Sequence, residues 1–283
     1  MINKLNNTIS SKQPIGVFDS GYGGLTILDE LIKSMPEYDF IYLGDNARAP
    51  YGTRSFDVIY EYTLQAVEKL FSMGCQLVVL ACNTASAKAL RTIQQRDLPR
   101  LAPNRRVLGV IRPSVEVLGS LSKSKHVGVL GTVGTVRSES YLMEMAKLYP
   151  DFIVTQEACP TWVPLVENRE FENEGGRYFI KKHIESLMAK DELIDTLILA
   201  CTHYPILQNE IRKVLPDHIK LISQGNIVAS SLIDYLERHP EIDEVCSKQG
   251  MLKFYTTESI SDFEEKASVF LKRELKAQHI ALN

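Results

Sequence analysis

Short apolar runs alternate along the chain with longer stretches in which apolar residues recur with the period of a helix. The runs predict strands at 15–18, 40–43, 77–80, 107–111, 126–130, 152–154, 196–199, 220–222 and 253–256. The periodic stretches predict helices at 25–32, between Ser55 and Gly74, and at 84–95, 138–148, 174–190, 202–214, 227–238 and 263–276. Strands that are apolar throughout and alternate with helices indicate parallel sheets covered on both faces.

Polar and reactive side chains follow several of the predicted strands directly. They are Asp19-Ser20, Asp45, Cys82-Asn83-Thr84, Thr132 and Cys201-Thr202-His203. Positions just after parallel strands lie at the carboxyl edge of a sheet, where ligands bind in open α/β folds and where helix N-termini offer free N–H groups to an anion. We therefore expect these side chains to gather in one cleft between two sheets whose carboxyl edges face each other.

Two parts of the pattern occur twice at nearly the same spacing. An apolar run ending in Ala-Cys, followed by an amide or hydroxyl residue, occurs at Cys82 and again at Cys201, and 201 − 82 = 119. A Gly-Val pair inside a predicted strand occurs at Gly16 and again at Gly128, and 128 − 16 = 112. The two offsets indicate duplicated halves related by a pseudo-two-fold axis, with the two cysteines facing each other across the cleft.

The repeat and the late strand at 220–222 predict two similar, doubly wound α/β domains, the first interrupted by the second. We expect residues 14–105 and 223–283 to form the first domain and residues 106–222 the second. The first domain then carries Asp19 and Cys82, and the second carries Cys201 and His203. Pro, Asn and Arg residues before position 106 mark the expected crossing between them.

Length and charge narrow the class of protein. The 283 residues suffice for two domains with cores of their own, and the net charge of −3 argues against nucleic acid as a main partner. No run approaches the roughly 18 apolar residues that a membrane span needs, so we expect no membrane partner. Residues 1–13 are polar, which predicts a flexible extension that is neither a secretory signal nor an anchor.

The cysteines favour a reducing compartment. There are five, an odd number in a chain without an export signal, which favours free thiols in the cytoplasm over a disulfide framework. A cysteine at a strand end is more often a buried apolar side chain than a nucleophile. We interpret Cys75, Cys159 and Cys246 in that way, whereas the repeat reverses this expectation for Cys82 and Cys201.

A pair of thiols at two helix N-termini can act as an acid and a base. The helix dipole favours the thiolate, so a thiol pKa of about 8.5 can fall toward neutrality. With one thiol on each face of a small substrate, a thiolate removes a proton from carbon while the opposite thiol delivers one, and the carbon is inverted. Asp19 is the expected proton partner of Cys82, and His203 that of Cys201. The charge of the carbanion can spread into an adjacent carboxylate of the substrate. The residues expected to donate hydrogen bonds to that carboxylate are Ser20, Asn83, Thr84 and Thr202.

Other kinds of site fit the sequence less well. Gly21, Gly23 and Gly24 do not complete G-x-G-x-x-G, which disfavours a dinucleotide site, and Cys201-x-His203 has no second cluster with zinc-like spacing. We therefore expect neither a metal nor another cofactor. A cysteine hydrolase leaves the second thiol unexplained, and a thiol-redox protein needs two cysteines able to bond. A non-catalytic amino-acid-binding protein stays an alternative, although it has no need of two matched thiols.

The motifs resemble those of glutamate racemase, in the order of that family and over nearly the whole chain. They are Asp19-Ser20-Gly21-Tyr22-Gly23-Gly24-Leu25-Thr26, Pro50-Tyr51-Gly52, Cys82-Asn83-Thr84-Ala85, Gly131-Thr132 to Ser138, Cys159 to Glu167, and Cys201-Thr202-His203-Tyr204-Pro205. The resemblance implies a cofactor-independent isomerase that interconverts L- and D-glutamate and supplies D-glutamate for peptidoglycan. It also implies a cytoplasmic enzyme, and we expect a homodimer.

The same resemblance implies roles for individual residues. Cys82 and Cys201 are expected to be catalytic, with Asp19, Glu167 and His203 assisting. Substrate contacts are expected at Asp19, Ser20, Tyr51, Gly52, Asn83, Thr84, Thr132, Thr202 and His203.

Two positions depart from the family pattern, and one alternative substrate stays open. Ala200 stands where the family usually has Gly before the second cysteine, and Ser223-Gln224-Gly225-Asn226 replaces an acidic turn. The alternative is a racemase of the same superfamily that acts on aspartate or another acidic amino acid, and those that act on aspartate commonly have Glu after the second Cys-Thr. His203 at that place favours glutamate.

Overall fold

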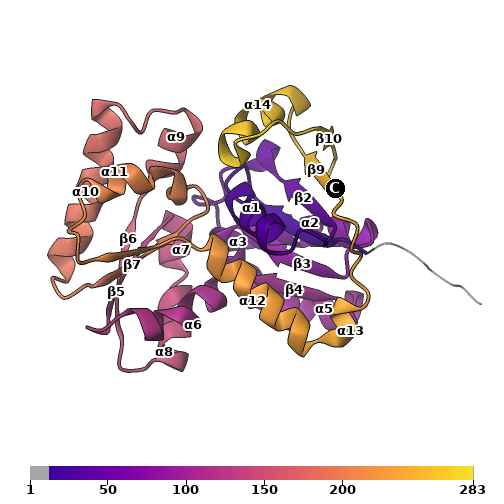
Figure 1. Cartoon of the computed structure of the whole chain (residues 1–283), viewed down its shortest axis with the longest axis horizontal. Helices are drawn as coiled ribbons and strands as arrows, with labels where there is room; N and C mark the ends of the chain where they lie inside the picture. The colour runs from indigo at the N-terminus through magenta and orange to yellow at the C-terminus, as the bar shows by residue number, and fades with distance from the viewer. Residues whose placement is uncertain (1–12, 283) are drawn as a thin grey trace, which may run out of the picture.

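The chain folds around two parallel β-sheets that lie side by side (Figure 1). The computed structural model describes residues 13–282, so nearly all of the expected extension lies outside the described residues. The six-stranded sheet contains β1 (Ile15–Asp19), β2 (Phe40–Gly44), β3 (Leu77–Leu80), β4 (Arg106–Gly109), β9 (Leu252–Thr256) and β10 (Ala277–His279). The four-stranded sheet contains β5 (His126–Gly131), β6 (Ile153–Ala158), β7 (Thr196–Ala200) and β8 (Lys220–Ile222). The predicted fold class, two α/β domains with parallel sheets, is confirmed.

The two sheets share an order of strands. The first runs β10-β9-β2-β1-β3-β4 and the second runs β6-β5-β7-β8, with every pairing parallel. The segment β2-β1-β3-β4 is thus repeated as β6-β5-β7-β8, so that β1 corresponds to β5 and β3 to β7. These are the strands that carry the repeated Gly-Val and Ala-Cys patterns. Cys82 and Cys201 therefore follow topologically equivalent strands.

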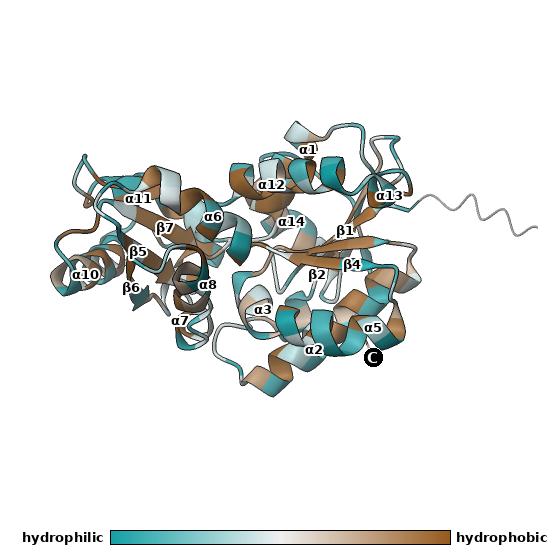
Figure 2. Cartoon of the chain, turned by 90° about the horizontal axis from the view of Figure 1, so that it is seen from below, coloured by the Kyte–Doolittle hydropathy of each residue, from teal (hydrophilic) through white to brown (hydrophobic). Residues whose placement is uncertain are grey.

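Helices cover both faces of the first sheet, and Figure 2 shows the apolar strands between them. One face packs against α1 (Leu25–Ser34), α12 (Gly225–Arg238) and α14 (Ile260–Leu271), and the other against α2 (Phe56–Ser72), α3 (Asn83–Lys88) and α5 (Leu98–Leu101). Successive side chains of a strand point to opposite faces, so Val17 joins the first layer and Phe18 the second. Burial on both faces explains why the strands are apolar at every position.

The second sheet is covered in the same way. Its two layers are α9 (Trp162–Glu167), α10 (Glu174–Lys190) and α11 (Gln208–Arg212) on one face, and α6 (Ile111–Leu121) and α8 (Ser140–Leu148) on the other. One apolar cluster runs from α1 and α12 to α10, so the domains share part of their core. The remaining elements are η1 (Asn46–Arg48), α4 (Leu90–Thr92), η2 (Ile93–Asp97), α7 (Val133–Arg137), η3 (Tyr204–Leu207) and α13 (Pro240–Asp243).

Local signals set the ends of α2 as the sequence predicts. The Ser55 hydroxyl accepts a hydrogen bond from the backbone N–H of Val58 at 3.4 Å and so caps the helix. Gly74, just beyond its last turn, has a φ of 98°, a conformation that favours glycine.

One strand lies in a different sheet from the one expected. The strand predicted at 107–111 was assigned to the second domain, but β4 pairs with β3 in the first sheet, and Ile111 already begins α6. The Pro and Asn residues before β4 form a turn into this last strand rather than a linker between domains, because Arg105 N–H donates to the Ala102 carbonyl at 3.0 Å. We propose that the first domain extends to about residue 109 and that the chain crosses between β4 and β5.

Other elements differ in length from the predictions. The helix expected at 84–95 is divided at Ala89 and continues as α4 and the π-helical turn η2. The helix expected after Cys201 is a 3₁₀ turn followed by the short α11. The last expected helix ends at Leu271, and β10, which the sequence pattern did not reveal, follows it. The helices α5, α6, α7, α9 and α13 were also missed.

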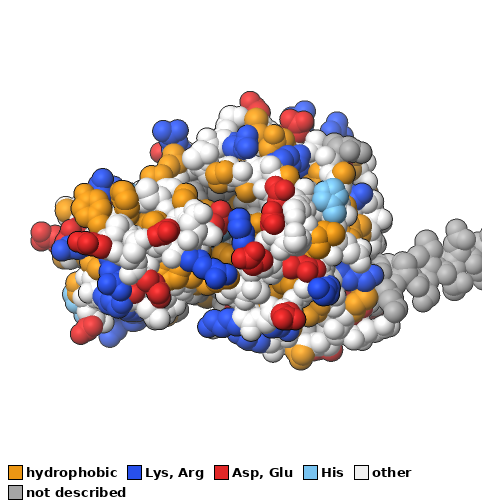
Figure 3. Space-filling model, turned by 90° about the horizontal axis from the view of Figure 1, so that it is seen from above, with side chains coloured by type: hydrophobic (Ala, Val, Ile, Leu, Met, Phe, Trp, Pro, Cys, Tyr) orange, Lys and Arg blue, Asp and Glu red, His pale blue; other side chains and the backbone are white. Residues whose placement is uncertain are grey.

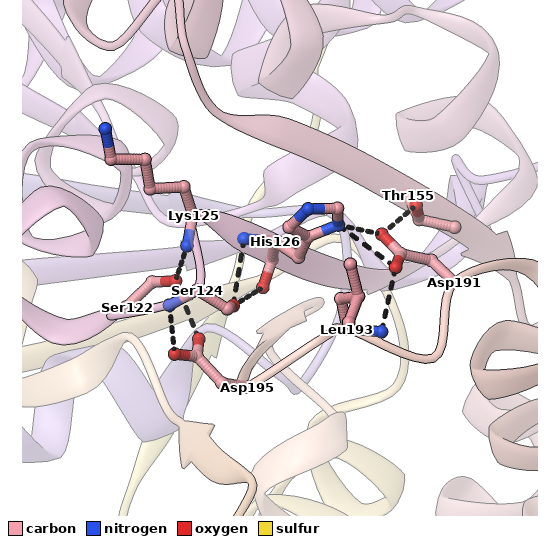
Figure 4. A network of polar contacts seen from close by, with 8 residues as sticks. All are labelled: Ser122, Ser124, Lys125, His126, Thr155, Asp191, Leu193 and Asp195. Carbon is pink, nitrogen blue, oxygen red and sulfur yellow. Dashed lines mark hydrogen bonds and ion pairs between the residues drawn. The ribbon is translucent and has the colours of Figure 1, made fainter.

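Polar contacts close the amino edge of the second sheet, at the opposite end from the reactive residues (Figure 4). Asp195 accepts hydrogen bonds from the hydroxyl of Ser122 and from the backbone N–H groups of Lys123 and Ser124 at 2.6–2.8 Å. These donors outweigh burial and lower the pKa of Asp195 to about 2. The carboxylate therefore anchors the loop that leads into β5. No helix within residues 13–282 has the length and apolar character to cross a bilayer.

Candidate active site

The carboxyl ends of the two sheets open into a shared cavity of about 150 Å³. The expected site residues that line it are Ser20, Tyr51, Gly52, Cys82, Asn83, Thr84, Thr132, Glu167, Cys201, Thr202 and His203. Asp19 is fully buried and contacts this group through Thr202, whose hydroxyl lies 3.4 Å from its Oδ1 atom. Both thiols and the residues expected to assist them thus meet in one place, although they come from distant parts of the chain.

Cys82 lies at the N-terminus of α3 and faces neutral donors. Its Sγ atom lies 3.3 Å from the Ser20 hydroxyl and accepts a hydrogen bond from the backbone N–H of Ala85 at 3.5 Å. Burial raises the pKa of the Cys82 thiol to about 12, and the charge of Asp19 acts in the same direction, whereas both donors oppose it. With no bound ligand, Cys82 is therefore protonated at neutral pH.

Cys201 faces a histidine instead. Its Sγ atom lies 4.0 Å from Nδ1 of His203, and Nε2 of the same ring lies 3.0 Å from the carboxylate of Glu167. Burial lowers the pKa of His203, but hydrogen bonds to Cys201 and Glu167 outweigh it and raise the pKa to about 10. His203 is thus an imidazolium at neutral pH, held between a sulfur atom and a carboxylate.

Asp19 and the glycine turn join the two halves of the cavity. One Asp19 oxygen accepts the backbone N–H of Gly21 at 2.9 Å; burial raises the pKa of this carboxyl, and the charge of His203 lowers it. A Cβ atom on Gly23 would lie 2.3 Å from the Thr202 hydroxyl and 2.4 Å from Nδ1 of His203. Only glycine therefore permits this close approach of the first domain to the second.

The loop after β2 reaches the second domain through its backbone. Gly134 N–H donates to the Gly52 carbonyl at 2.7 Å, while the Tyr51 side chain is buried and its hydroxyl donates to Asp45. The Tyr51 hydroxyl is therefore engaged by Asp45, and the substrate contact expected at Tyr51 stays a prediction.

Three hydroxyl groups meet on another wall of the cavity. The Thr84 hydroxyl lies 2.9 Å from that of Thr132 and 3.4 Å from that of Thr135. Thr132 also caps α7 by accepting the backbone N–H of Thr135 at 3.2 Å. These groups can donate to a carboxylate. Thr135 was not predicted, because it does not follow a strand.

The Asn83 side chain does not point a free amide at the cavity. Its Oδ1 atom accepts the Tyr141 hydroxyl at 2.8 Å, and its Nδ2 atom donates to the side chain of Gln224 at 2.6 Å. The amide expected to bind a substrate is therefore engaged within the protein. The backbone N–H of Asn83, the first residue of α3, has no acceptor within its helix and is the group suited to an anion.

Cys159 lines the same cavity as Cys201 but has different neighbours. Burial raises its pKa well above the usual range, and its Sγ atom contacts the Glu157 carbonyl at 3.8 Å. The structural role of Cys159 stays a prediction.

A larger cavity of about 700 Å³ lies along the later part of α3, between α6, α8 and α12. It contains neither Cys82 nor Cys201, so the chemistry and not the size identifies the candidate active site. Within residues 13–282 no three His, Cys, Asp or Glu side chains lie close enough to hold a metal ion.

On the face drawn in Figure 3, Lys and Arg are interspersed with Asp and Glu.

Comparison with known proteins places the chain in a family. The family model of Asp/Glu/hydantoin racemases matches residues 25–232. The glutamate racemase of Roseobacter denitrificans is 39% identical over 272 residues, which cover 93% of this chain and 98% of that protein. The glutamate racemase of Streptococcus agalactiae is 37% identical, covering 95% of this chain and 99% of its own.

Solved structures give the same result. A glutamate racemase isoform from Bacillus anthracis has a TM-score of 0.87 at 35% identity and covers 95% of this chain and 98% of its own. The glutamate racemase of Francisella tularensis in complex with D-glutamate has a TM-score of 0.85 at 31% identity, with 96% and 98% covered. An aspartate racemase from Picrophilus torridus, at 18% identity and a TM-score of 0.51, shares the fold alone. The chain belongs to the Asp/Glu/hydantoin racemase family.

Proposed function

We propose that this protein interconverts L- and D-glutamate with Cys82 and Cys201 as the acid and the base on opposite faces of the substrate. The observation that carries the proposal is that two thiols, each just after one of two topologically equivalent strands, line one cavity. A reaction that removes a proton from one face of a carbon and adds one to the other needs such a pair.

In the proposed direction from L-glutamate, the Cys201 half supplies the base. The protonated His203 lies 4.0 Å from Cys201 Sγ with Glu167 behind it, so a positive charge faces this sulfur atom. The Cys201 thiolate takes the α-proton of L-glutamate and becomes a thiol, which leaves the electron pair on the α-carbon.

The Cys82 half supplies the acid. Its raised pKa keeps it a thiol, so it donates its proton to the opposite face of the α-carbon and becomes a thiolate. The product is D-glutamate. The reverse reaction starts from this second state, with Cys82 as thiolate and Cys201 as thiol. It returns the protein to the first state, so each turnover in either direction removes one proton from the substrate and adds one.

The carbanion is stabilised by hydrogen-bond donors to the α-carboxylate, because these hydrogen bonds strengthen as negative charge moves into it. The Thr84 and Thr132 hydroxyls and the first backbone N–H groups of α3 lie on one wall of the cavity. Fixed donors in a buried site typically contribute about 3–4 kcal/mol of transition-state stabilisation each. No additional cofactor is required by this scheme.

The choice of glutamate rests on the relatives and on His203. The relatives from Roseobacter denitrificans and Streptococcus agalactiae and the solved structures from Bacillus anthracis and Francisella tularensis are glutamate racemases, the last of them in complex with D-glutamate. We further propose a cytoplasmic homodimer that supplies D-glutamate for peptidoglycan, as the resemblance to that family implies.

The test is to incubate the purified protein with L-glutamate and no added cofactor, and to follow the enantiomers by chiral chromatography. We expect the ratio of D- to L-glutamate to approach one. L-aspartate in parallel samples should react far more slowly. Faster turnover of aspartate would favour the alternative substrate, and binding of glutamate without conversion would favour an amino-acid-binding protein. Conversion only after addition of pyridoxal phosphate would overturn the thiol mechanism.

A further inference from the structure

We propose that Gln224 is a positioning residue for the Cys82 half of the reaction, acting through the side chain of Asn83. This inference rests on the proposed two-thiol racemisation. Gln224 stands in the turn that departs from the family pattern, and its side chain is 2% exposed. The hydrogen bonds of its side chain go to other residues than the two cysteines, so its effect on a thiol must pass through its hydrogen-bond partners.

The Gln224 side chain completes a closed ring of hydrogen bonds. Asn83 Nδ2 donates to Gln224 Oε1 at 2.6 Å, Gln224 Nε2 donates to the Tyr141 hydroxyl at 2.9 Å, and that hydroxyl donates to Asn83 Oδ1 at 2.8 Å. The second Gln224 N–H donates to the Ser114 hydroxyl at 2.7 Å, which in turn donates to the Val110 carbonyl at 2.6 Å. Each donor has an acceptor, and the ring permits one orientation of the Asn83 amide.

The ring lies where the chain passes between the domains. Val110 belongs to the connection from β4 to α6, and Gln224 to the connection from β8 to α12. Tyr141 comes from α8 of the second domain, and Asn83 from α3 of the first. Gln224 thus ties both connections and the second domain to the helix that begins next to Cys82.

The consequence for catalysis follows from the covalent neighbour of Asn83. Asn83 is the first residue of α3 and Cys82 is its N-cap, so fixing the Asn83 side chain fixes the start of the helix and the direction of the thiol. Misplacement of a reacting group by about 1 Å can cost about 100-fold in rate. Tyr141 lies within electrostatic range of Cys201, but no hydrogen bond between the described residues joins Cys201 to these side chains. The larger effect should therefore fall on proton transfer at Cys82.

The experiment uses Gln224→Met, which keeps the length of the side chain and removes both polar atoms. Its matched control is Gln208→Met, the same change on the nearby α11 at an exposed position. Tyr141→Phe is a second, milder variant. It removes one hydroxyl from the ring of hydrogen bonds and keeps the buried aromatic side chain. For each protein, kcat, KM and the primary isotope effects on kcat/KM are measured with α-deuterated D-glutamate and α-deuterated L-glutamate.

We expect Gln224→Met to lower kcat by about 10- to 100-fold with a smaller change in KM. Slower transfer at Cys82 should raise the isotope effect with deuterated D-glutamate and lower it with deuterated L-glutamate. Tyr141→Phe should shift both in the same directions by less, and Gln208→Met should match the unmodified protein. Isotope effects that stay unchanged in folded Gln224→Met and Tyr141→Phe would overturn the inference. If Gln224→Met does not fold, Tyr141→Phe alone decides it. Absence of racemisation in the unmodified protein would instead refute the proposed function.

Discussion

The two thiols hold equivalent places in two matching sheets, but their surroundings differ. Cys82 follows β3, faces the hydroxyl of Ser20 and lies near the carboxylate of Asp19. Cys201 follows β7 and faces His203, which the carboxylate of Glu167 keeps protonated. One thiol thus has a neutral donor and a negative charge beside it, and the other has a positive charge.

In the proposed mechanism, this difference in surroundings lets two equivalent positions of a duplicated scaffold serve as an acid and a base. Two identical thiols in identical surroundings would titrate together, so one would not be a thiolate while the other was a thiol. Pairs of titratable groups whose environments separate their protonation states mark the acid and the base of many enzymes. Here the fold supplies the placement, and the few side chains next to each sulfur supply the distinction.

The largest expected effect is the loss of either thiol. We expect Cys82→Ala and Cys201→Ala each to lower racemisation by at least about 10² to 10⁴, since each variant lacks one of two obligatory proton transfers. Initial rates in both directions, measured by chiral chromatography, test this. Cys246→Ala serves as the control at a buried thiol outside the cavity. An unchanged rate after removal of either Cys82 or Cys201 would break the comparison.

A change at Gly23 should come next in size. Gly23→Ala places a methyl group against Thr202 and His203 on the Cys201 side and must push that wall outward. We expect a loss of about 100-fold in kcat/KM, together with about 1–3 kcal/mol of stability. Gly175→Ala, at an open position in the first turn of α10, should leave activity unchanged. Thermal melting and kinetics of both variants provide the measurement, and equal behaviour of the two would contradict the close approach.

The charge on the Cys201 side can be probed by pH. Glu167→Gln removes the carboxylate that stabilises the imidazolium, so the pKa of His203 should fall from about 10. The alkaline limb of the rate profile should therefore move to lower pH, and racemisation near pH 9 should fall roughly tenfold, with a smaller loss near pH 7. Glu172→Gln, an exposed change nearby, is the control. An alkaline limb that stays in place would argue against the His203–Glu167 pair.

The smallest expected effect lies on the Cys82 side. Ser20→Ala removes a neutral hydroxyl 3.3 Å from Cys82 Sγ, and a hydrogen bond of this kind is worth about 0.5–1.5 kcal/mol, or roughly two- to tenfold in rate. The shape of the pH profile should change little, because no charge is lost. A shift of the alkaline limb as large as that of Glu167→Gln would remove the distinction between the two halves.

Much of this arrangement could be predicted from local sequence. An apolar run followed by Cys-Asn-Thr or Cys-Thr-His already specifies a buried strand with reactive groups at its carboxyl edge. The repeat at Cys82 and Cys201 indicates two halves, because the same local pattern dictates the same place in each sheet. The strand order β2-β1-β3-β4 and β6-β5-β7-β8 agrees with that prediction.

What could not be predicted depends on contacts between distant residues. The assignment of β4 to the first sheet depends on its pairing with β3. The short edge strand β10 is defined by its backbone pairing with β9. The engagement of the Asn83 amide depends on Gln224, which lies 141 positions away. A polar residue at a strand end predicts a site, but whether its side chain faces a ligand or another side chain is decided by such partners.

Solvent hydrogen exchange in the two cysteine variants tests the two-thiol account most directly. In the proposed mechanism, Cys201 removes the α-proton of L-glutamate and Cys82 that of D-glutamate. In deuterated water, Cys82→Ala should therefore exchange the α-hydrogen of L-glutamate alone, and Cys201→Ala that of D-glutamate alone, as followed by proton NMR. Loss of exchange for both enantiomers in one variant, with little change in the other, would contradict the account and leave one thiol without a catalytic role.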